Sequence, residues 1–268
     1  MHPLKSLLIR SAANARAQTA LQWLVDRAQF LMGIGAGAGM DTSAEHAVLR
    51  HLRERAPQPW CIFDVGANRG QFLRLLRQQL DGCDYAVHGF EPGRSTFALL
   101  QQAAGADSRV RLNRLAIGRQ PGCAQLHYDA AGSGLASLTR RRLDHFDLAF
   151  TQSEPVEITT LDAYCAQHGI GRIDLLKLDI EGHELDALQG GRQMLEQGRV
   201  GLIVFEFGGC NIDTRTFLQD FWYLFQELGY TLHRLTPGGY LHPLPAYREN
   251  LEQFRTTHFV AMPRSLTG

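Results

Sequence analysis

Strand-like and helix-like patterns alternate along the chain from Trp60 onward. The segment "WCIFDV" (60–65) has the apolar pattern of a buried strand, and a helical pattern begins near Gly70. The alternation continues to a last strand at "THFVAM" (257–262), and several of the strand segments are apolar on both faces. Such strands are typical of a mostly parallel sheet that helices cover on both sides. The sequence therefore predicts an α/β fold.

Between these two strands, the patterns predict further elements in a regular order. The expected strands and short extended segments cover 85–91, 109–118, 124–129, 155–160, 173–180 and 200–207. The expected helices cover 94–104, 161–169, 184–198 and 216–229. The segment "GSGLASLTRRRLDHF" (132–146) has little periodicity and is expected to form a polar loop.

The composition excludes several classes of protein. The 268 residues include 27 Lys and Arg against 27 Asp and Glu, and this balance argues against a nucleic-acid binder. The five cysteines form no C-x-x-C pair, so neither a zinc cluster nor a disulfide framework is indicated, and a cytoplasmic location is expected. Because no run of about 18 apolar residues occurs, we expect no transmembrane helix.

The N-terminal region is expected to form a helical extension, residues 1–58, before a main domain over 59–268. It contains an amphipathic segment whose apolar face consists of Ala17, Leu21, Leu24, Ala28 and Leu31. The same region carries four basic residues, Lys5, Arg10, Arg16 and Arg27, against only Asp26. We expect this helix to dock on the domain or on a second subunit of a homo-oligomer, with peripheral contact to a membrane surface as the alternative.

Two short motifs connect this helix to the main domain. The segment "GIGAGAG" (33–39) lacks the G-x-G-x-x-G spacing of a nucleotide fingerprint and follows a helix rather than a strand. It is expected to be a flexible connector or a lip over a site. Thr42 and Glu45 then have the spacing of a capping box, which predicts the start of a further helix.

The first expected strand ends in "DVGANRG" (64–70). Gly66 and Gly70 lack a Cβ atom, so the backbone there can turn tightly and approach a ligand closely. Asn68 tolerates unusual backbone angles, and the Asp64 carboxylate would repel a pyrophosphate but suits a cation or an amino group. Ligands bind outside the carboxyl ends of the strands in open parallel sheets. We therefore expect a cofactor site that includes Asp64, Gly66, Ala67, Asn68, Gly70 and, on the next helix, Phe72.

The second expected strand ends in Glu91 and Pro92, 25 residues (91 − 66) after Gly66. An acid at this place accepts the hydroxyls of a ribose in dinucleotide folds. Together, the two strand ends describe a pocket for a ribose beside a positively charged group. S-adenosylmethionine combines an adenosine with an aminoacyl sulfonium and has no phosphates, so it is the cofactor that the sequence predicts.

The segment "IDLLKLDIEGHE" (173–184) gathers ionisable residues at the end of another strand. Lys177, Asp179, Glu181 and His183 are the expected catalytic group, because ionisable side chains at such a turn are costly unless they are solvated, paired or used. A buried ion pair is the alternative interpretation for Lys177 and Asp179. Glu184 is expected to complement the positive end of the next helix.

Two mechanisms fit these residues. A hydroxyl acceptor must lose its proton, and a carboxylate or histidine of the group can accept it. Alternatively, Asp179 and Glu206, which ends the next strand, could hold a divalent ion through oxygen ligands. The sequence does not choose between the two.

Several segments resemble the FkbM-type S-adenosylmethionine-dependent methyltransferases. The likeness runs from about 60 to 207 through "FDVGANRGQF", "FEP", "RLAIG", "ITTLDAYC" and "IDLLKLDIEGHELDALQGG". It implies a Rossmann-like class I methyltransferase fold, with a mostly parallel seven-stranded sheet and a reversed last hairpin. It also implies O-methylation, commonly of hydroxyls on sugars, glycans, glycolipids or secondary metabolites.

The resemblance also assigns roles to residues. The loop with Asp64, Gly66, Asn68 and Gly70 would bind the cofactor, and Glu91 would bind the ribose diol. Ala116 and Ile117 would lie near the adenine, and Ser137 would belong to a loop over the cofactor. The residues implied to face the transferred methyl group are Asp179, Glu181 and His183.

Two other functions compete with this one. An NAD-dependent oxidoreductase would need a phosphate-binding G-x-G-x-x-G, which residues 64–70 do not supply. A non-catalytic binding or scaffolding module would have no physical need for both the cofactor loop and the acidic cluster. Acceptor specificity is expected to lie in 33–39, in 130–150 and in 208–250. The last region contains Trp222, Tyr223, Tyr240 and Tyr247, which could stack on a sugar, with a core position as the alternative for Trp222.

Overall fold

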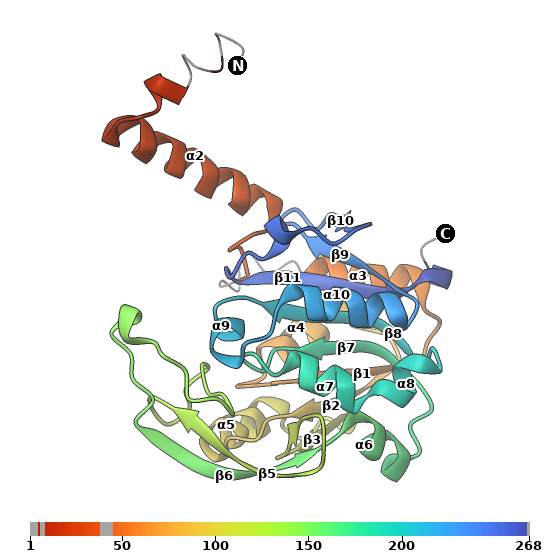
Figure 1. Ribbon diagram of the computed structural model, residues 1–268. Helices are drawn as coiled ribbons and strands as arrows, with labels where there is room; N and C mark the ends of the chain where they lie inside the picture. Colours follow the sequence, from red (N-terminus) through yellow and green to blue (C-terminus); the bar gives the residue numbers. More distant parts are fainter. Residues whose placement is uncertain (1–4, 6–8, 38–44, 267–268) are drawn as a thin grey trace.

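A computed structural model describes Lys5 and residues 9–37 and 45–266 (Figure 1). Ala38, Gly39 and Thr42 lie outside the described residues, and with them the end of the expected connector and the start of the expected capping box. Within the described residues, no helix is both long enough and apolar enough to cross a membrane.

The described part of the chain forms a central sheet of eight strands. In spatial order they are β10 (Leu241–Pro243), β9 (Tyr230–Leu235), β11 (Thr257–Pro263), β8 (Val200–Phe207), β7 (Ile173–Leu178), β1 (Trp60–Val65), β2 (Tyr85–Phe90) and β3 (Val110–Asn113). The run from β8 to β3 is parallel, and β11 is antiparallel to both β8 and β9. The predicted α/β class, the mostly parallel sheet and the reversed last hairpin are confirmed.

The expected number of seven strands in this sheet is wrong. The eighth strand, β10, pairs antiparallel with β9 at the edge of the sheet. A tight turn folds it back, because the Gly239 amide donates to the Thr236 carbonyl at 2.9 Å and the Thr236 amide donates to Tyr240 at 3.0 Å. The strands β9 and β10 both lie in the region 208–250, where acceptor specificity is expected.

A second, three-stranded sheet lies beside the first (Figure 1). It has the order β4 (Ala116–Ile117), β6 (Gln152–Thr159) and β5 (Gly122–Tyr128). The single strand expected at 109–118 is therefore two strands in different sheets, since the chain leaves β3 after Asn113 and pairs again with β6 at Ala116. This sheet supports the long segment between β5 and β6, which runs toward the carboxyl ends of the central strands.

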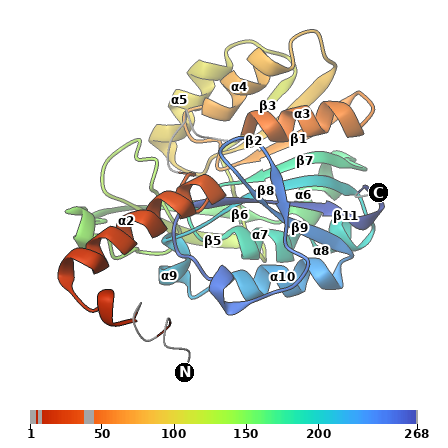
Figure 2. The same ribbon diagram turned by 90° about the horizontal axis from the view of Figure 1, so that it is seen from above.

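Helices cover both faces of the central sheet, as expected (Figure 2). Residues of α3 (Glu45–Arg55), α4 (Gln71–Gln79) and α5 (Arg94–Ala104) pack on one face. Residues of α6 (Leu161–His168), α7 (Glu184–Gly190), α8 (Arg192–Glu196) and α10 (Leu218–Glu227) pack on the other. Further helical segments among the described residues include α2 (Ala15–Met32), α9 (Cys210–Thr214), and the 3-10 turns η2 (Asp144–Phe146), η3 (Glu249–Leu251) and η4 (Arg264–Leu266).

Two helices differ from their expected placement. The helix expected at 184–198 is broken into α7 and α8 at Gly191, next to Gly190, where a Cβ atom would lie 2.1 Å from the Gly118 carbonyl oxygen. Helix α3 lies before the expected domain boundary at 58, but four of its residues are buried, and they pack into the core of the main sheet. In contrast, α2 has no buried residue and projects from the domain (Figure 1).

Candidate active site

The carboxyl ends of β1, β2 and β7 meet at one edge of the central sheet. After β1 the chain turns at Gly66, whose φ of 83° favours glycine, and its amide donates to the Phe90 carbonyl at 3.0 Å. A Cβ atom on Gly66 would lie only 1.9 Å from the Asp179 carbonyl oxygen. The absence of this atom therefore lets the ends of β1 and β7 touch.

The first cavity at this edge contains most of the residues that the sequence singled out. Its wall includes Gly66, Asn68, Glu91, Pro92, Ala116, Ile117, Ser137, Asp179, Glu181 and His183. The predicted residues Ala67, Phe72 and Lys177 instead line a second cavity, and Asp64 and Gly70 line neither. The first cavity measures only about 70 Å³, because residues 133–138 lie over it.

Glu91 joins the ends of β1 and β2. One carboxylate oxygen accepts from the Asn68 amide at 3.1 Å, and the other accepts from the Gly93 amide at 2.9 Å. Burial raises the pKa of Glu91 to about 7, although these two hydrogen bonds limit the rise. Each oxygen keeps a second lone pair, so the carboxylate can still accept hydrogen bonds from a ligand.

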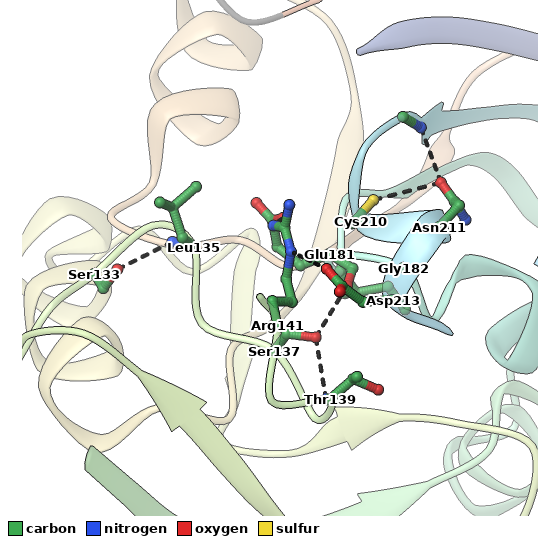
Figure 3. Close-up of polar contacts among 12 residues, drawn as sticks. Ser133, Leu135, Ser137, Thr139, Arg141, Glu181, Gly182, Cys210, Asn211 and Asp213 are labelled. Carbon is green, nitrogen blue, oxygen red and sulfur yellow. Dashed lines mark hydrogen bonds and ion pairs between the residues drawn. The ribbon is translucent and has the colours of Figure 1, made fainter. Parts of the chain in front are cut away.

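The segment 133–139, here called the covering segment, is tied to the turn after β7 (Figure 3). The Ser137 hydroxyl donates to the Glu181 carbonyl at 2.9 Å, and Thr139 contacts His183 Nε2 at 3.0 Å. His183 Nδ1 lies 3.0 Å from Asp186. Both ring nitrogens of His183 therefore have partners, and this side chain joins the covering segment to α7.

Lys177 lies between two carboxylates at the wall of the second cavity. Its Nζ atom is 3.0 Å from Asp179 Oδ2 and 3.6 Å from Asp64 Oδ1. Burial raises the pKa of Asp64 to about 6, and Lys177 opposes that rise. For Asp179, burial acts in the same direction, but the effect of Lys177 prevails and the pKa is lowered. The expected ion pair of Lys177 and Asp179 exists, and Asp179 also reaches both cavities.

Glu181 and Glu184 occupy the turn between Asp179 and α7. Glu181 has the left-handed φ of 53° and forms an ion pair with Arg141, which also lies 3.5 Å from Asp213 (Figure 3). Burial raises the pKa of Glu181 to about 8, and Arg141 limits the rise. The fully buried Glu184 accepts from the Ile180 and Gly182 amides at 2.9 and 3.3 Å. Glu184 therefore holds the turn itself, consistent with the structural role expected for it.

The second cavity, of about 380 Å³, adjoins the first. Five residues line both cavities, namely Gly66, Asn68, Gly134, Asp179 and Glu181. Glu206 on β8 and His258 on β11 are paired in register, and His258 Nε2 lies 3.7 Å from Glu206 Oε2. Burial raises the pKa of Glu206 and lowers the pKa of His258. Asp179, Glu206 and His258 thus form a polar row across β7, β8 and β11.

Four residues of the second cavity were not expected there, namely Gln71, Thr256, His258 and Glu45, the last of which was expected only to cap a helix. Leu135, Arg141 and Phe146 lie in the segment 130–150, and Gly37 lies in the segment 33–39, where acceptor specificity is expected. No local motif marks His258, and its place beside Glu206 depends on β11 entering the sheet next to β8.

The four aromatic residues noted in the region 208–250 line neither cavity, so contact between them and a sugar finds no support there. Trp222 is half-buried against the core and forms an edge contact with Tyr223. Tyr240 is 63% exposed and lies near β10. Aromatic contact with a ligand in the second cavity would come instead from Phe146, which is 65% exposed.

The structure gives little support for a metal centre at Asp179 and Glu206. Within the described residues, no group of three or more His, Cys, Asp or Glu side chains is arranged to hold a metal ion. A divalent ion held by Asp179 and Glu206 would need further ligands from water or from the acceptor.

Comparison with known proteins identifies the family. The family model described as the methyltransferase FkbM domain matches residues 64–232. The chain belongs to the FkbM methyltransferase family. This confirms the resemblance carried by its motifs and makes it an S-adenosylmethionine-dependent methyltransferase.

Two curated relatives of this FkbM-family chain are each 29% identical to it. The 2-O-methyltransferase NoeI of Sinorhizobium fredii aligns over 66% of this chain and 75% of the relative. The 31-O-demethyl-FK506 methyltransferase FkbM of Streptomyces tacrolimicus aligns over 54% of this chain, and the match covers 64% of that protein. The crystal structure of methyltransferase FkbM from Methylobacillus flagellatus is 17% identical, with a TM-score of 0.46, and the match covers 79% of this chain and 50% of that one.

The first cavity of this FkbM methyltransferase fits the chemistry of S-adenosylmethionine. Its described wall contains no Lys or Arg that would suit a phosphate, but it includes the carboxylates of Glu91, Asp179 and Glu181. The buried Asn68 Oδ1 atom has no hydrogen-bond partner within the described residues and is ready to accept from an amino group. The volume of the first cavity, about 70 Å³, is well below the usual size of ligand sites, and residues 133–138 form part of its wall.

Proposed function

We propose that the chain methylates a hydroxyl oxygen of a small hydroxylated acceptor, such as a sugar unit, that binds in the second cavity. The observation that carries this proposal is the shared wall of the two cavities. A cofactor in the first cavity and an acceptor in the second would meet at Asp179 and Glu181. Methyl transfer requires two partners held close and in line, and this arrangement supplies such a place.

The roles in cofactor binding follow from the first cavity. Glu91 would accept the two ribose hydroxyls, and Asn68 Oδ1 would accept from the amino group. Ala116 and Ile117 offer an apolar wall for the adenine, and both are buried. When bound, S-adenosylmethionine supplies a methyl group on a positively charged sulfur atom. The covering segment then excludes water from the reacting atoms, because Ser137 and Thr139 hold it to the turn after β7.

We assign the proton-accepting role to Asp179. Its Oδ2 atom is held by Lys177, which leaves Oδ1 to accept the proton of the acceptor hydroxyl. Lys177 keeps this carboxylate ionised by lowering its pKa, and Asp179 belongs to both cavities. Glu181 is less available because Arg141 binds it, and both nitrogens of His183 already have partners. His258 is the second candidate, since its lowered pKa keeps it neutral at neutral pH.

The lining of the second cavity supports a hydroxylated acceptor. Several carboxylates, Arg141 and His258 offer hydrogen bonds in different directions, while Phe146 and Phe72 offer apolar surfaces. Hydroxyl groups can donate to the carboxylates, and the C–H face of a sugar ring can pack on an aromatic side chain. The names of both curated relatives specify methylation at an oxygen, which favours the same chemistry here.

The test is a titration with S-adenosylhomocysteine, followed by turnover assays on a panel of hydroxylated acceptors. We expect binding by calorimetry and release of S-adenosylhomocysteine with at least one sugar or polyol acceptor. Mass spectrometry of the product should place the added methyl group on oxygen. Methylation at nitrogen or carbon would refute the O-methyl assignment, and binding without turnover on any acceptor would favour a non-catalytic module.

A further inference from the structure

Helix α2 presents a broad apolar surface that the domain does not cover. In both overall views it projects from the body of the molecule, and none of its residues is buried (Figures 1 and 2). Leu31 is 73% exposed, Trp23 60% and Leu24 57%. The large exposed side chains of this helix are Leu21, Trp23, Leu24, Val25, Phe30, Leu31 and Met32.

The opposite side of α2 attaches the helix to the domain. Arg255 donates to Asp26 at 3.0 Å and to Gln29 at 2.6 Å, and Gln29 also contacts Gln253. At 100° per residue, Asp26 lies opposite the apolar stripe of Ala17, Leu21, Leu24, Ala28 and Leu31. The polar side therefore faces the protein and the apolar side faces outward, the reverse of an ordinary surface helix.

Specific contacts also hold the C-terminal end of α2 in place. Arg234 donates from Nε to the Met32 carbonyl at 2.8 Å, and Gly33 ends the helix with a φ of 94°. A Cβ atom on Gly33 would lie 2.2 Å from the Leu235 carbonyl oxygen, so the chain packs tightly against β9 there. The outward direction of the apolar stripe thus follows from specific contacts at the C-terminal end of the helix.

The charge of the N-terminal region indicates what kind of surface binds the apolar stripe of α2. Residues 1–37 contain Lys5, Arg10, Arg16 and Arg27, and their only acid is Asp26. Asp26 is engaged by Arg255 on the inner side. Arg16 and Arg27 lie along one side of the stripe, and the Arg27 guanidinium lies 5.7 Å from the centre of the Trp23 ring. Leucine and aromatic side chains bordered by arginine are typical of helices that lie in the interface of an anionic membrane.

We propose that α2 binds the surface of an anionic phospholipid bilayer, with its apolar stripe in the acyl boundary and its arginines at the headgroups. A second copy of the chain fits less well, because pairing two such helices would bring their excess positive charge together. The second cavity lies next to this surface, since Gly37, five residues after the end of α2, lines that cavity and donates to the Thr256 carbonyl at 3.1 Å.

Vesicle flotation of the full chain tests this proposal. We expect binding to vesicles of phosphatidylcholine and phosphatidylglycerol and at least tenfold weaker binding to phosphatidylcholine alone. Raising the salt to 0.5 M should weaken the binding, because exposed charges are then screened (Debye length about 4 Å). Equal binding to both kinds of vesicle, or none to the anionic kind, would overturn the proposal.

Matched variants test whether the apolar stripe, rather than another part of α2, binds the membrane. The double variant Leu24→Ser and Leu31→Ser should bind anionic vesicles at least tenfold more weakly than the unaltered chain. The control, Thr19→Ser and Gln22→Ser, makes two replacements on the inner side and should bind normally. The thermal midpoint and the affinity for S-adenosylhomocysteine should be unchanged in both, because the domain buries no residue of α2.

The oligomeric state gives an independent test. Light scattering of the full chain should show a monomer at the micromolar concentrations used for flotation. A dimer that dissociates in the Leu24→Ser and Leu31→Ser variant, together with no vesicle binding, would assign the stripe to a second copy instead. None of these measurements depends on methyl transfer, so the membrane proposal can fail while the proposed reaction stands.

Discussion

The first and second cavities share a wall but are assembled in different ways. About half of the first cavity comes from the last residues of β1 and β2 and the turns after β1, β2 and β7, and β4 and the covering segment supply most of the rest. The second draws residues from much of the chain, from Gly37 to His258. A methyl donor is the same molecule in every methyltransferase of this kind, whereas acceptors differ. In the proposed reaction, a compact set of turns would hold the shared ligand, while scattered segments would shape the site of the variable one.

The largest expected effect lies at the shared wall. Asp179→Asn should lower kcat by about 10²- to 10⁴-fold, the usual contribution of a proton-accepting group. Binding of S-adenosylhomocysteine should change by less than about threefold, since the side chain keeps its shape and only its charge is removed. The measurement combines turnover with calorimetry. Asp81→Asn, at an exposed position outside both cavities, should behave as the unaltered chain does.

Full activity in Asp179→Asn would remove the assigned role. In that case the pH–rate profile of His258→Gln would decide whether the second candidate accepts the proton. Loss of the acidic limb of the profile would favour His258, because protonation of its ring inactivates it as a base.

The next effect should be confined to the first cavity. Glu91→Ala should weaken binding of S-adenosylhomocysteine by at least about a hundredfold, because two hydrogen bonds to a charged group are lost at roughly 1.5–3 kcal/mol each. Activity at saturating cofactor should fall far less. Glu157→Ala, an exposed acid on β6, serves as the control. Unchanged calorimetric affinity in Glu91→Ala would contradict the ribose-binding role.

The raised pKa of Glu91 predicts that the stability of the folded chain depends on pH. Its pKa is raised to about 7 in the folded protein, so between pH 4.5 and 7 the folded chain holds a proton that the unfolded chain releases. Stability due to this group therefore falls as the pH rises through that interval. Relative to the original chain, Glu91→Gln should gain roughly 2–3 kcal/mol in the free energy of unfolding between pH 5 and pH 8. Chemical denaturation at both pH values measures this, and a constant difference would show that Glu91 ionises normally.

The smallest expected effect belongs to the second cavity alone. Phe146→Ala should raise the KM for the acceptor about fivefold, since a half-covered aromatic contact contributes on the order of 1 kcal/mol. It should leave the affinity for S-adenosylhomocysteine unchanged. Tyr223→Ala removes a similarly exposed ring outside both cavities and should alter neither value. A weaker cofactor affinity in Phe146→Ala would show that the two cavities are not independent.

The first cavity was more predictable from the sequence than the second, and the reason is physical. Glu91, Asn68 and Asp179 each follow a strand closely, and parallel strands bring such turns to one edge by necessity. Arg141 and His258 reach the second cavity only through the path of the chain after the covering segment and the insertion of β11 between β8 and β9. Both positions depend on contacts between residues far apart in the sequence, so local patterns do not predict which of these side chains meet in the cavity.

The errors in the predicted fold have the same origin. The two strands within 109–118 looked like one because the change of sheet after Asn113 depends on a distant partner, β6. The edge strand β10 is only three residues long and has no apolar alternation of its own. Elements buried between helices, such as β1 and β7, carry their pattern within themselves and were placed correctly.

The missing side chain at Gly66 fixes the spacing between two strand ends. A Cβ atom at residue 66 would lie only 1.9 Å from the backbone carbonyl oxygen of Asp179, so even alanine would push the ends of β1 and β7 apart by about an ångström. In the proposed reaction the donor lies beside the loop after β1 and the acceptor lies beside Asp179. A displacement of that size would then spoil the linear alignment of donor and acceptor, and a single hydrogen atom at residue 66 prevents it.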